Sequence, residues 1–478
     1  MKFKEYSFRE LLSKIVDNRG RTCPTAEDGI PLIATNCIKN TSLYPVYEKI
    51  RYVSKDTYDN WFRGHPEPGD MIFVCKGSPG RVCWVPDPIP FCIAQDMVAI
   101  RADENVVYPR YLFALLRSKD TQGRILNMHV GSLIPHFKKG DFANLYLEIP
   151  SDMEYQKQVG DLYMAFCEKI DANHKINQTL EQIAQAIFKS WFVDFEPVKA
   201  KIAALEAGGS EEDVLFAAMQ AISGKGEPEL TRLQAEQPEQ YAELRATAEL
   251  FPSALQNSEL EEIPEGWNIS HIGDEVLVVG GGTPSTKNPA FWEAGEINWT
   301  SPKDLSNLAD KILVETERKI TAAGLAKISS GLLPVDTVLM SSRAPVGYLA
   351  MAKIPVAVNQ GYIAMKCQKT LSPEFVIQWC EAHMDEIKSR ASGTTFEEIS
   401  KKNFKIIPLV IPPEPLISIY SKQVSSLYEA IKNNAQESDT LEKLRDSLLP
   451  KLLSGELSVI DDLDQRAAEP RRALQGVE

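Results

Sequence analysis

The sequence contains no long hydrophobic run, because none of its apolar stretches reaches the roughly 18 residues that a membrane-spanning helix needs. Its start, Met1 to Glu5, is charged and no apolar stretch follows, so we expect no secretory signal and no membrane partner. The eight cysteines include no Cys-x-x-Cys pair, and the six histidines include no His-Glu-x-x-His pattern. These absences argue against a disulfide framework and a zinc site, and they favour reduced, mostly buried thiols in a cytoplasmic protein.

The chain also lacks an excess of positive charge. It has 52 Lys and Arg against 66 Asp and Glu, a formal net charge of −14, which by itself argues against a nucleic-acid binder because phosphates are neutralised by cations. The charge is uneven, however. Residues 1–150 carry 20 basic and 17 acidic side chains, residues 151–262 carry 9 and 21, residues 263–412 carry 15 and 16, and residues 413–478 carry 8 and 12. Two near-neutral blocks of similar size therefore alternate with two acidic ones, and DNA binding stays open for the near-neutral blocks.

The two near-neutral blocks repeat one pattern. Four pairs of segments align in the same order, at an offset that drifts only from 266 to 261 residues. The first pair reads as a strand, a polar loop with Pro and Gly, and a second strand. The aligned pairs are Gly69–Val85 with Val335–Met351, Ile93–Ile100 with Val358–Met365, Phe142–Pro150 with Phe404–Pro412, and Thr179–Glu181 with Thr440–Glu442. We interpret them as an internal repeat that covers most of each half.

A helical stretch follows each copy of the repeat. Residues 154–192 contain no Pro, and about 39 residues would form a helix of roughly 60 Å. Leu427, Leu441, Leu444 and Leu448 occupy equivalent places in the second copy. We expect the two helices to pack antiparallel, which would give the chain an approximate two-fold axis. The predicted seam residues of the first helix are Val159, Leu162, Phe166, Ile176, Leu180, Ile183 and Ile187.

One asparagine of each helix falls at the same place in the repeat. Asn173 and Asn434 coincide at an interior position of the predicted seam. A buried Asn can fix the register of paired helices, although both residues could equally lie on a solvated flank.

The fold class predicted from these features is α+β, with two tandem α/β domains joined by two long antiparallel helices and a pseudo-two-fold internal repeat. Between the halves, a Glu-, Gln- and Ala-rich spacer is expected to hold two short helices at about 211–222 and 230–248. The predicted boundaries are 1–150 and 263–412 for the domains, 151–199 and 413–457 for the helices, 200–262 for the acidic spacer and 458–478 for a polar tail.

Two short motifs could point to catalysis, and both are incomplete. Val278–Gly282 resembles a strand that enters a phosphate-binding loop, but no helix pattern follows to present its amides. Asn288–Phe291 resembles the Asn-Pro-Pro-Phe motif of adenine methyltransferases, but its second Pro is replaced and no cofactor-binding βαβ unit precedes it. An enzyme with an unrecognised site and a protein-binding scaffold remain the alternatives to a DNA-binding function.

Binding to DNA fits the repeat better than catalysis. Two similar domains held apart by rigid helices can contact two places on one partner, and protein symmetry matches the spacing of DNA half-sites. The loops between paired strands carry side chains that can bond to bases or phosphates. Gln95 and Gln360 could instead cap the sheet, and the lysine pairs 138–139 and 401–402 could instead be ordinary solvent-exposed residues. The candidates are Lys76, Ser78, Arg81, Gln95, Lys138 and Lys139 in the first half, and Ser341, Ser342, Arg343, Gln360, Lys401 and Lys402 in the second.

Several motifs resemble those of the type I restriction-modification specificity (S) subunits. Gly281–Ser285, followed by Trp292, Gly295 and Trp299, resembles the entry to a target-recognition domain. Leu180–Val198 and Leu441–Leu457 resemble the family's central and distal conserved helices, and Ile263–Trp267 resembles the opening of its second domain. The first domain departs from this pattern, since it opens with Asn18–Pro24 instead. The resemblance covers nearly all of residues 1–460.

The resemblance implies a non-catalytic subunit of a larger complex. Each target-recognition domain would read one half of a split double-stranded DNA site through the major groove, with Thr283 among the contacts. The helices would set the gap and dock two modification subunits, which methylate adenine with S-adenosylmethionine. Two restriction subunits would use ATP and Mg²⁺, so no cofactor is expected in this chain, and its host would be a bacterium or an archaeon.

The resemblance also implies a docking surface for those subunits. Its expected residues are Phe188, Trp191, Phe192, Phe195, Leu448 and Leu452. The alternative is that these side chains only pack the helix ends onto a domain of the same chain.

Overall fold

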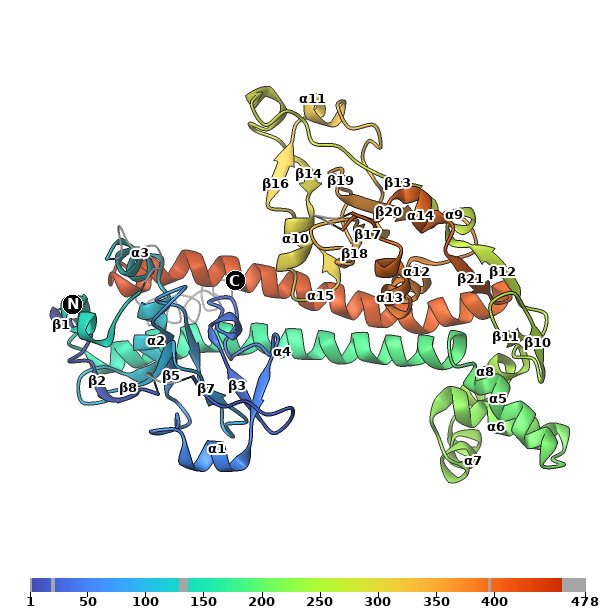
Figure 1. The fold of residues 1–478 in the computed structure, drawn as a ribbon, viewed down its shortest axis with the longest axis horizontal. Helices are drawn as coiled ribbons and strands as arrows, with labels where there is room; N and C mark the ends of the chain where they lie inside the picture. Colours follow the sequence, from blue (N-terminus) through green and yellow to red (C-terminus); the bar gives the residue numbers. More distant parts are fainter. Residues whose placement is uncertain (1, 19–21, 129–135, 394–396, 458–478) are drawn as a thin grey trace, which may run out of the picture. The chain divides into compact units, whose positions relative to one another are not determined.

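The computed structural model describes residues 2–18, 22–128, 136–393 and 397–457 (Figure 1). The predicted tail at 458–478 and residues 19–21 of the first domain's opening lie outside this range. The described chain forms two compact units. Unit 1 comprises residues up to 172 and from 437 onward, and unit 2 comprises residues 173–436. No helix in the described part of the chain has both the length and the apolar content to cross a bilayer.

Unit 1 contains three small sheets. Its four-stranded sheet has the order β2-β8-β5-β6, its three-stranded sheet has the order β4-β3-β7, and β1 pairs with β9. The strands are β1 (Phe3–Ser7), β2 (Leu12–Val16), β3 (Ile30–Ile33), β4 (Arg51–Val53), β5 (Met71–Val74), β6 (Val82–Trp84), β7 (Cys92–Ile93), β8 (Met97–Ala102) and β9 (Tyr146–Pro150). The helices are η1 (Thr35–Cys37), α1 (Lys55–Asn60), α2 (Pro109–Arg117), α3 (Lys119–Asn127) and η2 (Lys139–Asn144).

Unit 2 builds the same arrangement with one additional strand in its largest sheet and an additional two-stranded sheet, β10 with β11. Its five-stranded sheet has the order β13-β20-β17-β18-β15, its three-stranded sheet has the order β16-β14-β19, and β12 pairs with β21. The strands are β10 (Leu255–Asn257), β11 (Glu262–Pro264), β12 (Asn268–His271), β13 (Leu277–Val279), β14 (Ile297–Thr300), β15 (Ile312–Leu313), β16 (Arg318–Ile320), β17 (Thr337–Ser341), β18 (Leu349–Ala352), β19 (Ala357–Val358), β20 (Tyr362–Lys366) and β21 (Pro408–Ile411). The domain's helices are α9 (Ile272–Glu275), η3 (Pro289–Phe291), α10 (Pro302–Asn307), α11 (Ala322–Leu325), α12 (Pro373–Ala382), α13 (Met384–Ser389) and α14 (Lys401–Lys405).

The predicted repeat is confirmed by the strand registers. In unit 1 the central strand β3 pairs antiparallel with β4 and parallel with β7, and in unit 2 β14 pairs in the same way with β16 and β19. The register is also equivalent, since Leu32 lies opposite Cys92 and Trp299 lies opposite Ala357. The polar loops that the alignment paired both connect hairpin strands, β5 to β6 and β17 to β18. The repeat is therefore structural as well as sequential.

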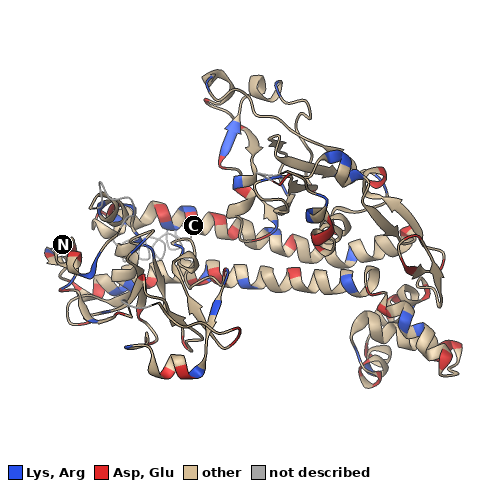
Figure 2. Ribbon diagram, in the orientation of Figure 1, with Lys and Arg blue, Asp and Glu red and all other residues tan. Residues whose placement is uncertain are grey.

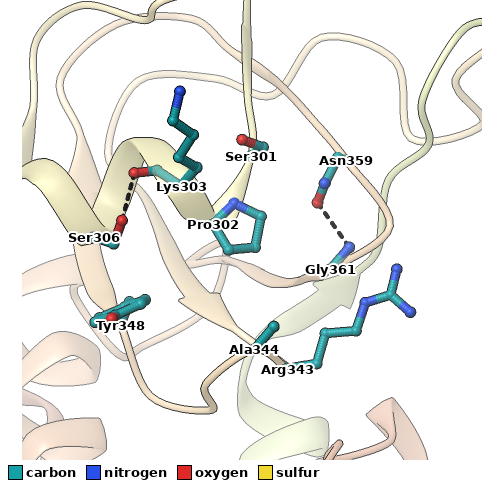
Figure 3. Close-up of a pocket in the computed structure, with 9 residues that line it drawn as sticks. All are labelled: Ser301, Pro302, Lys303, Ser306, Arg343, Ala344, Tyr348, Asn359 and Gly361. Atoms are coloured by element: carbon teal, nitrogen blue, oxygen red, sulfur yellow. Dashed lines mark hydrogen bonds between the residues drawn. The ribbon is translucent and has the colours of Figure 1, made fainter. Parts of the chain in front are cut away.

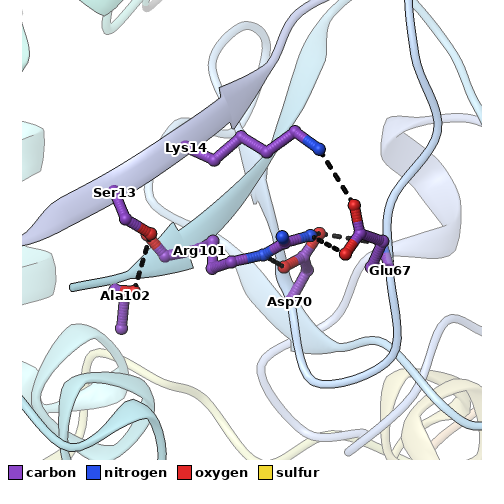
Figure 4. Close-up of polar contacts among 6 residues, drawn as sticks. All are labelled: Ser13, Lys14, Glu67, Asp70, Arg101 and Ala102. Carbon is purple, nitrogen blue, oxygen red and sulfur yellow. Dashed lines mark hydrogen bonds and ion pairs between the residues drawn. The ribbon is translucent and has the colours of Figure 1, made fainter. Parts of the chain in front are cut away.

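The aligned acidic residue before each of these hairpins is paired with a cation, but the cation comes from strand β8 in unit 1 and from the residue after β18 in unit 2. Figure 4 shows the guanidinium of Arg101, on β8, between the carboxylates of Asp70 and Glu67, at 2.8 Å from each. Hydrogen bonds from Arg101 and Lys14 lower the pKa of Glu67 to about 2. In unit 2, Asp336 instead pairs with Lys353 at 2.7 Å. The acid is repeated, whereas its partner is not.

Two 40-residue helices, α4 (Met153–Phe192) and α15 (Glu414–Leu453), follow the two copies. In unit 1, the hydroxyl of Tyr155 donates to the carbonyl of Leu452, and Lys169 pairs with Glu437 at 2.9 Å. From Tyr155 to Lys169 the residue numbers of α4 rise, while those of their partners on α15 fall. The two helices therefore run antiparallel in this unit. The antiparallel pairing is therefore confirmed within this unit.

Asparagines line the same helix pair in unit 2. Asn173 is fully buried and its side-chain nitrogen donates to the carbonyl of Asn434 at 3.4 Å. The amide of Asn434 donates to Asn177 Oδ1 at 2.8 Å, and Asn177 in turn donates to the carbonyl of Ile431. Asn173 therefore lies inside the helix pair and not on a solvated flank. Each of these hydrogen bonds joins one helix to the other. Such bonds suit a register-fixing role, because a slip would leave buried amides unpaired.

The predicted apolar seam of α4 needs correction. Ile176 and Ile183 are 49% and 43% exposed, while Asn177 and Ala184 are buried. Tyr163, Ile170, Asn177, Ala184 and Trp191 are buried at intervals of seven residues, so the heptad is present but lies one residue further along than predicted. The two isoleucines therefore lie on the surface of α4.

The predicted acidic spacer is folded. Four helices follow one another, α5 (Glu196–Glu206), α6 (Glu211–Ser223), α7 (Glu227–Glu236) and α8 (Pro238–Glu249). They enclose a small core of Ala218, Met219, Leu230 and Ala248. The predicted helix at 230–248 is divided at Gln237, because Pro238 cannot donate the backbone bond that would continue α7. Figure 2 marks Asp and Glu in red along the ribbons of these helices.

The cysteines are mostly buried, as predicted. All eight cysteines are free, and six are buried. Burial raises the pKa of the Cys92 thiol to about 12, so this thiol is protonated near neutral pH.

Candidate nucleic-acid interface

Three loops of unit 2 meet at the ends of its strands. They are the glycine run after β13, the β17–β18 loop and the β19–β20 loop. The amide of Gly282 donates to the carbonyl of Val358 at 2.9 Å, and the amide of Ser342 donates to the carbonyl of Gly361 at 2.8 Å. Backbone bonds therefore hold the three loops together, independently of any side chain that they expose.

A pocket of about 440 Å³ lies among these loops (Figure 3). Arg343 and Lys303 lie on opposite sides of it, and Asn359 contributes an amide. The full lining is Ser301, Pro302, Lys303, Ser306, Arg343, Ala344, Tyr348, Asn359 and Gly361. The pocket thus presents two cations and several hydrogen-bonding groups, which suit a ligand rich in acceptors.

Arg343 lies at the tip of the β17–β18 loop. Its guanidinium is 3.8 Å from the carboxylate of Glu398, and both side chains are partly exposed. At that distance the pair is weak, so an incoming acceptor can replace Glu398 at little cost. Arg343 was predicted to contact DNA, and its side chain is partly exposed to solvent.

Ser341 and Ser342, predicted beside Arg343, have a different position. Both are buried. The hydroxyl of Ser341 donates to the carbonyl of Pro345 at 2.7 Å and accepts from the amide of Tyr348 at 2.8 Å. These bonds close the loop on itself. The serine side chains shape the loop that carries Arg343, and they do not extend from its surface.

Thr283 and Gln360 contact each other. The Thr283 hydroxyl donates to Gln360 Oε1 at 2.7 Å, and both residues are exposed. The side-chain NH₂ of Gln360 makes no hydrogen bond to the described residues and can donate to a base edge. Gln360 therefore lies in a loop and does not cap the sheet from inside.

The glycine run after β13 has no helix directly behind it. The next helical segment is η3, which begins at Pro289, so no helix N-terminus presents its amides to a phosphate there. Asn288 accepts a bond from the amide of Ala290 at 3.1 Å and caps this short turn. The glycine run therefore lacks the helix N-terminus that a phosphate-binding loop needs.

The paired lysines lie beside the same loops in both units. In unit 2 the amide of Ile399 donates to the carbonyl of Ser342, and exposed Lys401 and Lys402 begin α14. In unit 1 the amide of Phe137 donates to the carbonyl of Cys75, just before exposed Lys138 and Lys139. The repeat therefore places a basic pair next to the hairpin loop twice.

The hairpin loop of unit 1 presents the other first-half candidates. Lys76 and Arg81 are exposed, whereas Ser78 and Gln95 are half-buried. The amide of Lys76 donates to the carbonyl of Asp96 at 3.2 Å, which ties the hairpin loop to the loop that holds Gln95. The structure thus brings these four residues into two neighbouring loops.

The residues predicted for subunit docking lie mostly inside the chain. Phe188, Trp191 and Phe192 are at most 7% exposed, and their rings pack against rings of unit 2. Those rings are Phe251, Trp267, Phe375 and Tyr420. Side chains enclosed in this way cannot contact a second chain. They pack the end of α4 against the rest of unit 2, which was the alternative to docking.

The three other predicted docking residues follow the same pattern. Leu452 is buried in the core of unit 1, Leu448 packs against that core, and the ring of Phe195 meets Trp267 edge-on at 5.6 Å. The exposed apolar residues of α4 are others, Ile176 and Ile183.

Lys303, Asn359 and Tyr348 are pocket residues that the sequence analysis missed. Asn359 lies beside Gln360 in an aligned segment, but its counterpart in the first half is Ala94, so the repeat does not mark it. Lys303 follows β14, which the alignment did not reach, and its ammonium pairs with Glu317 at 3.0 Å. No local motif marks it.

The chain is similar to known proteins over most of its length. Residues 13–182 and 264–443 match the family model of the type I restriction modification DNA specificity domain. Over 401 residues the chain is 33% identical to the type I restriction enzyme HindI specificity subunit of Haemophilus influenzae, covering 81% of this chain and 86% of that protein. Over 196 residues it is 31% identical to the type I restriction enzyme MjaIX specificity subunit of Methanocaldococcus jannaschii, covering 41% and 45%. The type I restriction-modification S subunit from M. genitalium aligns over 95% of this chain and 96% of that chain, at 13% identity and a TM-score of 0.49.

The two matched ranges correspond to the two copies of the repeat, each with part of its following helix. The Haemophilus relative is similar over most of both chains. The chain therefore belongs to the family of type I restriction-modification specificity subunits.

Proposed function

We propose that this chain selects the DNA sequence on which a type I restriction-modification complex acts. Recognition domain 1 (residues 1–150) reads one half of a bipartite site, and recognition domain 2 (residues 263–412) reads the other. The observation that carries the proposal is the repeated hairpin loop with its neighbouring basic pair, which offers exposed cations at equivalent places in both domains.

The exposed groups suit base edges in the major groove. Arg343 can donate two parallel bonds to guanine, and the amides of Gln360 and Asn359 can bond adenine in the same paired manner. Lys303 and Lys401 supply single charges that suit phosphates. Domain 1 offers Lys76, Arg81 and Lys138 for the same two tasks.

The modest charge of the two domains implies help from other subunits. Together they carry 35 basic and 33 acidic side chains, so they can neutralise few phosphates. Most phosphate contacts then come from the modification subunits, and tight DNA binding requires the assembled complex. Those subunits use S-adenosylmethionine, and restriction subunits use ATP and Mg²⁺, while this chain holds no cofactor of its own.

We place part of the docking surface for a modification subunit on the exposed face of α4. Ile176 and Ile183 are seven residues apart, two turns along the helix, so they lie on one face. Both are more than 40% exposed, and covering them with a partner would remove apolar surface from water. Replacing both with Asp should prevent assembly, whereas replacing the equally exposed Lys175 and Gln182 should not.

The test of the function is methylation by the assembled complex. Purified chain with its modification subunit should methylate adenine only in DNA that contains both half-sites. Arg343→Gln should change the preference for the second half alone, and Arg390→Gln is its matched control, because the Arg390 guanidinium already pairs with Glu386 at 2.7 Å. Equal methylation without this chain would refute the proposal.

The helices are proposed to set the gap between the half-sites. Residues 153–172 of α4 belong to unit 1 and residues 173–192 belong to unit 2, and α15 is divided in the same way at residue 436. One heptad inserted into each helix at these boundaries adds about 10 Å. At 3.4 Å per base pair, the gap should lengthen by about three base pairs. An active variant with an unchanged gap would contradict this role, and a heptad inserted into one helix alone is the control for disruption.

A further inference from the structure

Each unit presents an exposed arginine at the same place in its three-stranded sheet. Arg51 on β4 lies opposite Leu32, and Arg318 on β16 lies opposite Trp299. Leu32 and Trp299 are themselves equivalent, because each faces the parallel strand, β7 or β19, on its other side. Strand register thus identifies Arg51 and Arg318 as counterparts, although the aligned sequence segments include neither.

Both arginines lack an acidic partner within the described residues. Neither guanidinium makes an ion pair or a side-chain hydrogen bond there, and both side chains are exposed. Several other arginines are paired with carboxylates. Arg101 pairs with Asp70 and Glu67, Arg245 with Glu212, and Arg390 with Glu386. An unpaired arginine at one position of both copies is therefore distinctive.

Arg318 is also held in place. Its guanidinium carbon lies 3.5 Å from the ring centre of Trp292 and 5.4 Å from that of Trp299. The two indoles meet at 88°, with centres 5.1 Å apart. Contact with an aromatic face fixes the plane of a guanidinium while leaving its N–H edge free. The donors of Arg318 are thus preorganised for a ligand with two adjacent acceptors.

The same tryptophans connect Arg318 to the candidate interface. The indole N–H of Trp299 donates to the carbonyl of Gly282 at 3.1 Å, next to Thr283. The indole N–H of Trp292 donates to the carbonyl of Ser285 at 3.1 Å. In addition, β14 ends at Thr300, directly before pocket residue Ser301. Arg318 therefore belongs to the frame that supports the glycine loop and the pocket.

We propose that Arg51 and Arg318 contact DNA, each donating to acceptors of the half-site read by its own domain. The inference rests on the proposed function and adds a pair of contacts to it. The ligand chemistry is a pair of adjacent acceptors, which a guanine edge (O6 and N7) and a phosphate group both provide. Arg318, already fixed in orientation, loses little freedom on binding.

The test uses the complex of full-length chain and modification subunit. Arg318→Gln should weaken binding and methylation roughly ten- to hundred-fold for the second half-site and leave selection of the first unchanged. Arg51→Gln should have the opposite pattern. Arg390→Gln, which alters a paired arginine, should change neither.

Two readouts separate the sources of the acceptors. A guanine contact predicts loss of discrimination at one base pair, whereas a phosphate contact predicts uniform weakening and a salt dependence reduced by about one contact. Either result supports the inference. Wild-type binding and methylation by both variants would overturn it, and so would an equal effect of each variant on both half-sites.

A conservative variant guards against a purely structural effect. Arg318→Lys keeps a cation over the indoles but loses the planar fork of donors. It should unfold at the wild-type temperature and still lose recognition of the second half-site, and wild-type recognition by this variant would overturn the bidentate contact. Methylation by the wild-type complex without regard to either half-site would instead refute the proposed function.

Discussion

Gly281 lies where the glycine loop touches the backbone of the β19–β20 loop. A Cβ at this position would be 1.8 Å from the carbonyl oxygen of Val358 and 2.7 Å from that of Asn359. Real Cβ atoms essentially never come within 3.0 Å of another heavy atom, so Gly281→Ala must push the loops apart by roughly 1.2 Å or more. A backbone carbonyl cannot rotate away as a side chain can. The substitution should therefore separate the two loops.

The cost follows from the contacts that this separation breaks. The Gly282–Val358 backbone bond and the Thr283–Gln360 bond are lost, at about 0.5–1.5 kcal/mol each. Overpacking in a close-packed region adds about 1–3 kcal/mol. We expect a local destabilisation of about 2–6 kcal/mol, together with loss of second half-site recognition because Gln360 and the pocket loop shift.

Gly282→Ala is the matched control. The nearest atoms to a Cβ at Gly282, in Ile328 and Lys327, are 3.9 Å away, which is ordinary contact. Hydrogen exchange of the segments 277–283 and 357–366 is the assay. Exchange should accelerate at least about 30-fold in Gly281→Ala, since 1.4 kcal/mol corresponds to a factor of ten. Equal protection of the two variants would refute the close approach of these loops.

Three further substitutions test the packing and the charges of the units. Glu67→Gln should lower the unfolding temperature at pH 6 but not near pH 2. The stabilisation that comes from a lowered carboxyl pKa is present above pH 4.5 and disappears as the pH falls toward about 2. An equal decrease in unfolding temperature at both pH values would contradict the pairing of Glu67 with Arg101. Gly160→Ala would place a Cβ 2.5 Å from a backbone nitrogen of α2. Urea denaturation should therefore show that unit 1 is destabilised by about 1–3 kcal/mol. Gly123 has open space around it, so the control Gly123→Ala should be neutral or stabilising. Phe188→Ala should cost about 3–5 kcal/mol in calorimetric unfolding of unit 2, and a loss below 1 kcal/mol would contradict its burial.

The sequence was sufficient to predict the repeated framework of the fold. The strands around Ile72–Val74 and Val338–Met340 are fully buried, and a buried strand must be apolar in both copies of a repeat. The helices were predictable because a 39-residue stretch without Pro and with apolar residues every three or four positions has few alternatives. Patterns of this kind reflect contacts close in sequence.

The sequence could not show which apolar residues the chain itself would cover. Phe188 and Trp191 carry the apolar character of a docking surface, yet Tyr420 packs against both. That covering residue lies more than 200 positions away, so no local pattern contains it. Ile176 and Ile183 were misassigned because the seven-residue spacing was predicted one residue out of phase, and the residues that the fold buries are the next ones, Asn177 and Ala184.

The site was predictable where the repeat marks it and not elsewhere. Arg343 and Gln360 lie in aligned loops, so comparison of the two halves singled them out. Arg51 and Arg318 lie on short strands whose equivalence depends on register across β3 and β14. Only the paired strands reveal that these two arginines occupy one position, and that neither has an acidic partner within the described residues.

The central claim is that this chain gives a methyltransferase complex a bipartite DNA site. Mapping methylated adenines across a genome, in cells that carry this chain and its modification subunit, tests it most directly. We predict one motif with two defined parts separated by a fixed, undefined gap, and Arg343→Gln should alter only one of the parts. A single continuous motif, or an unchanged methylation pattern after deletion of this chain, would contradict the claim.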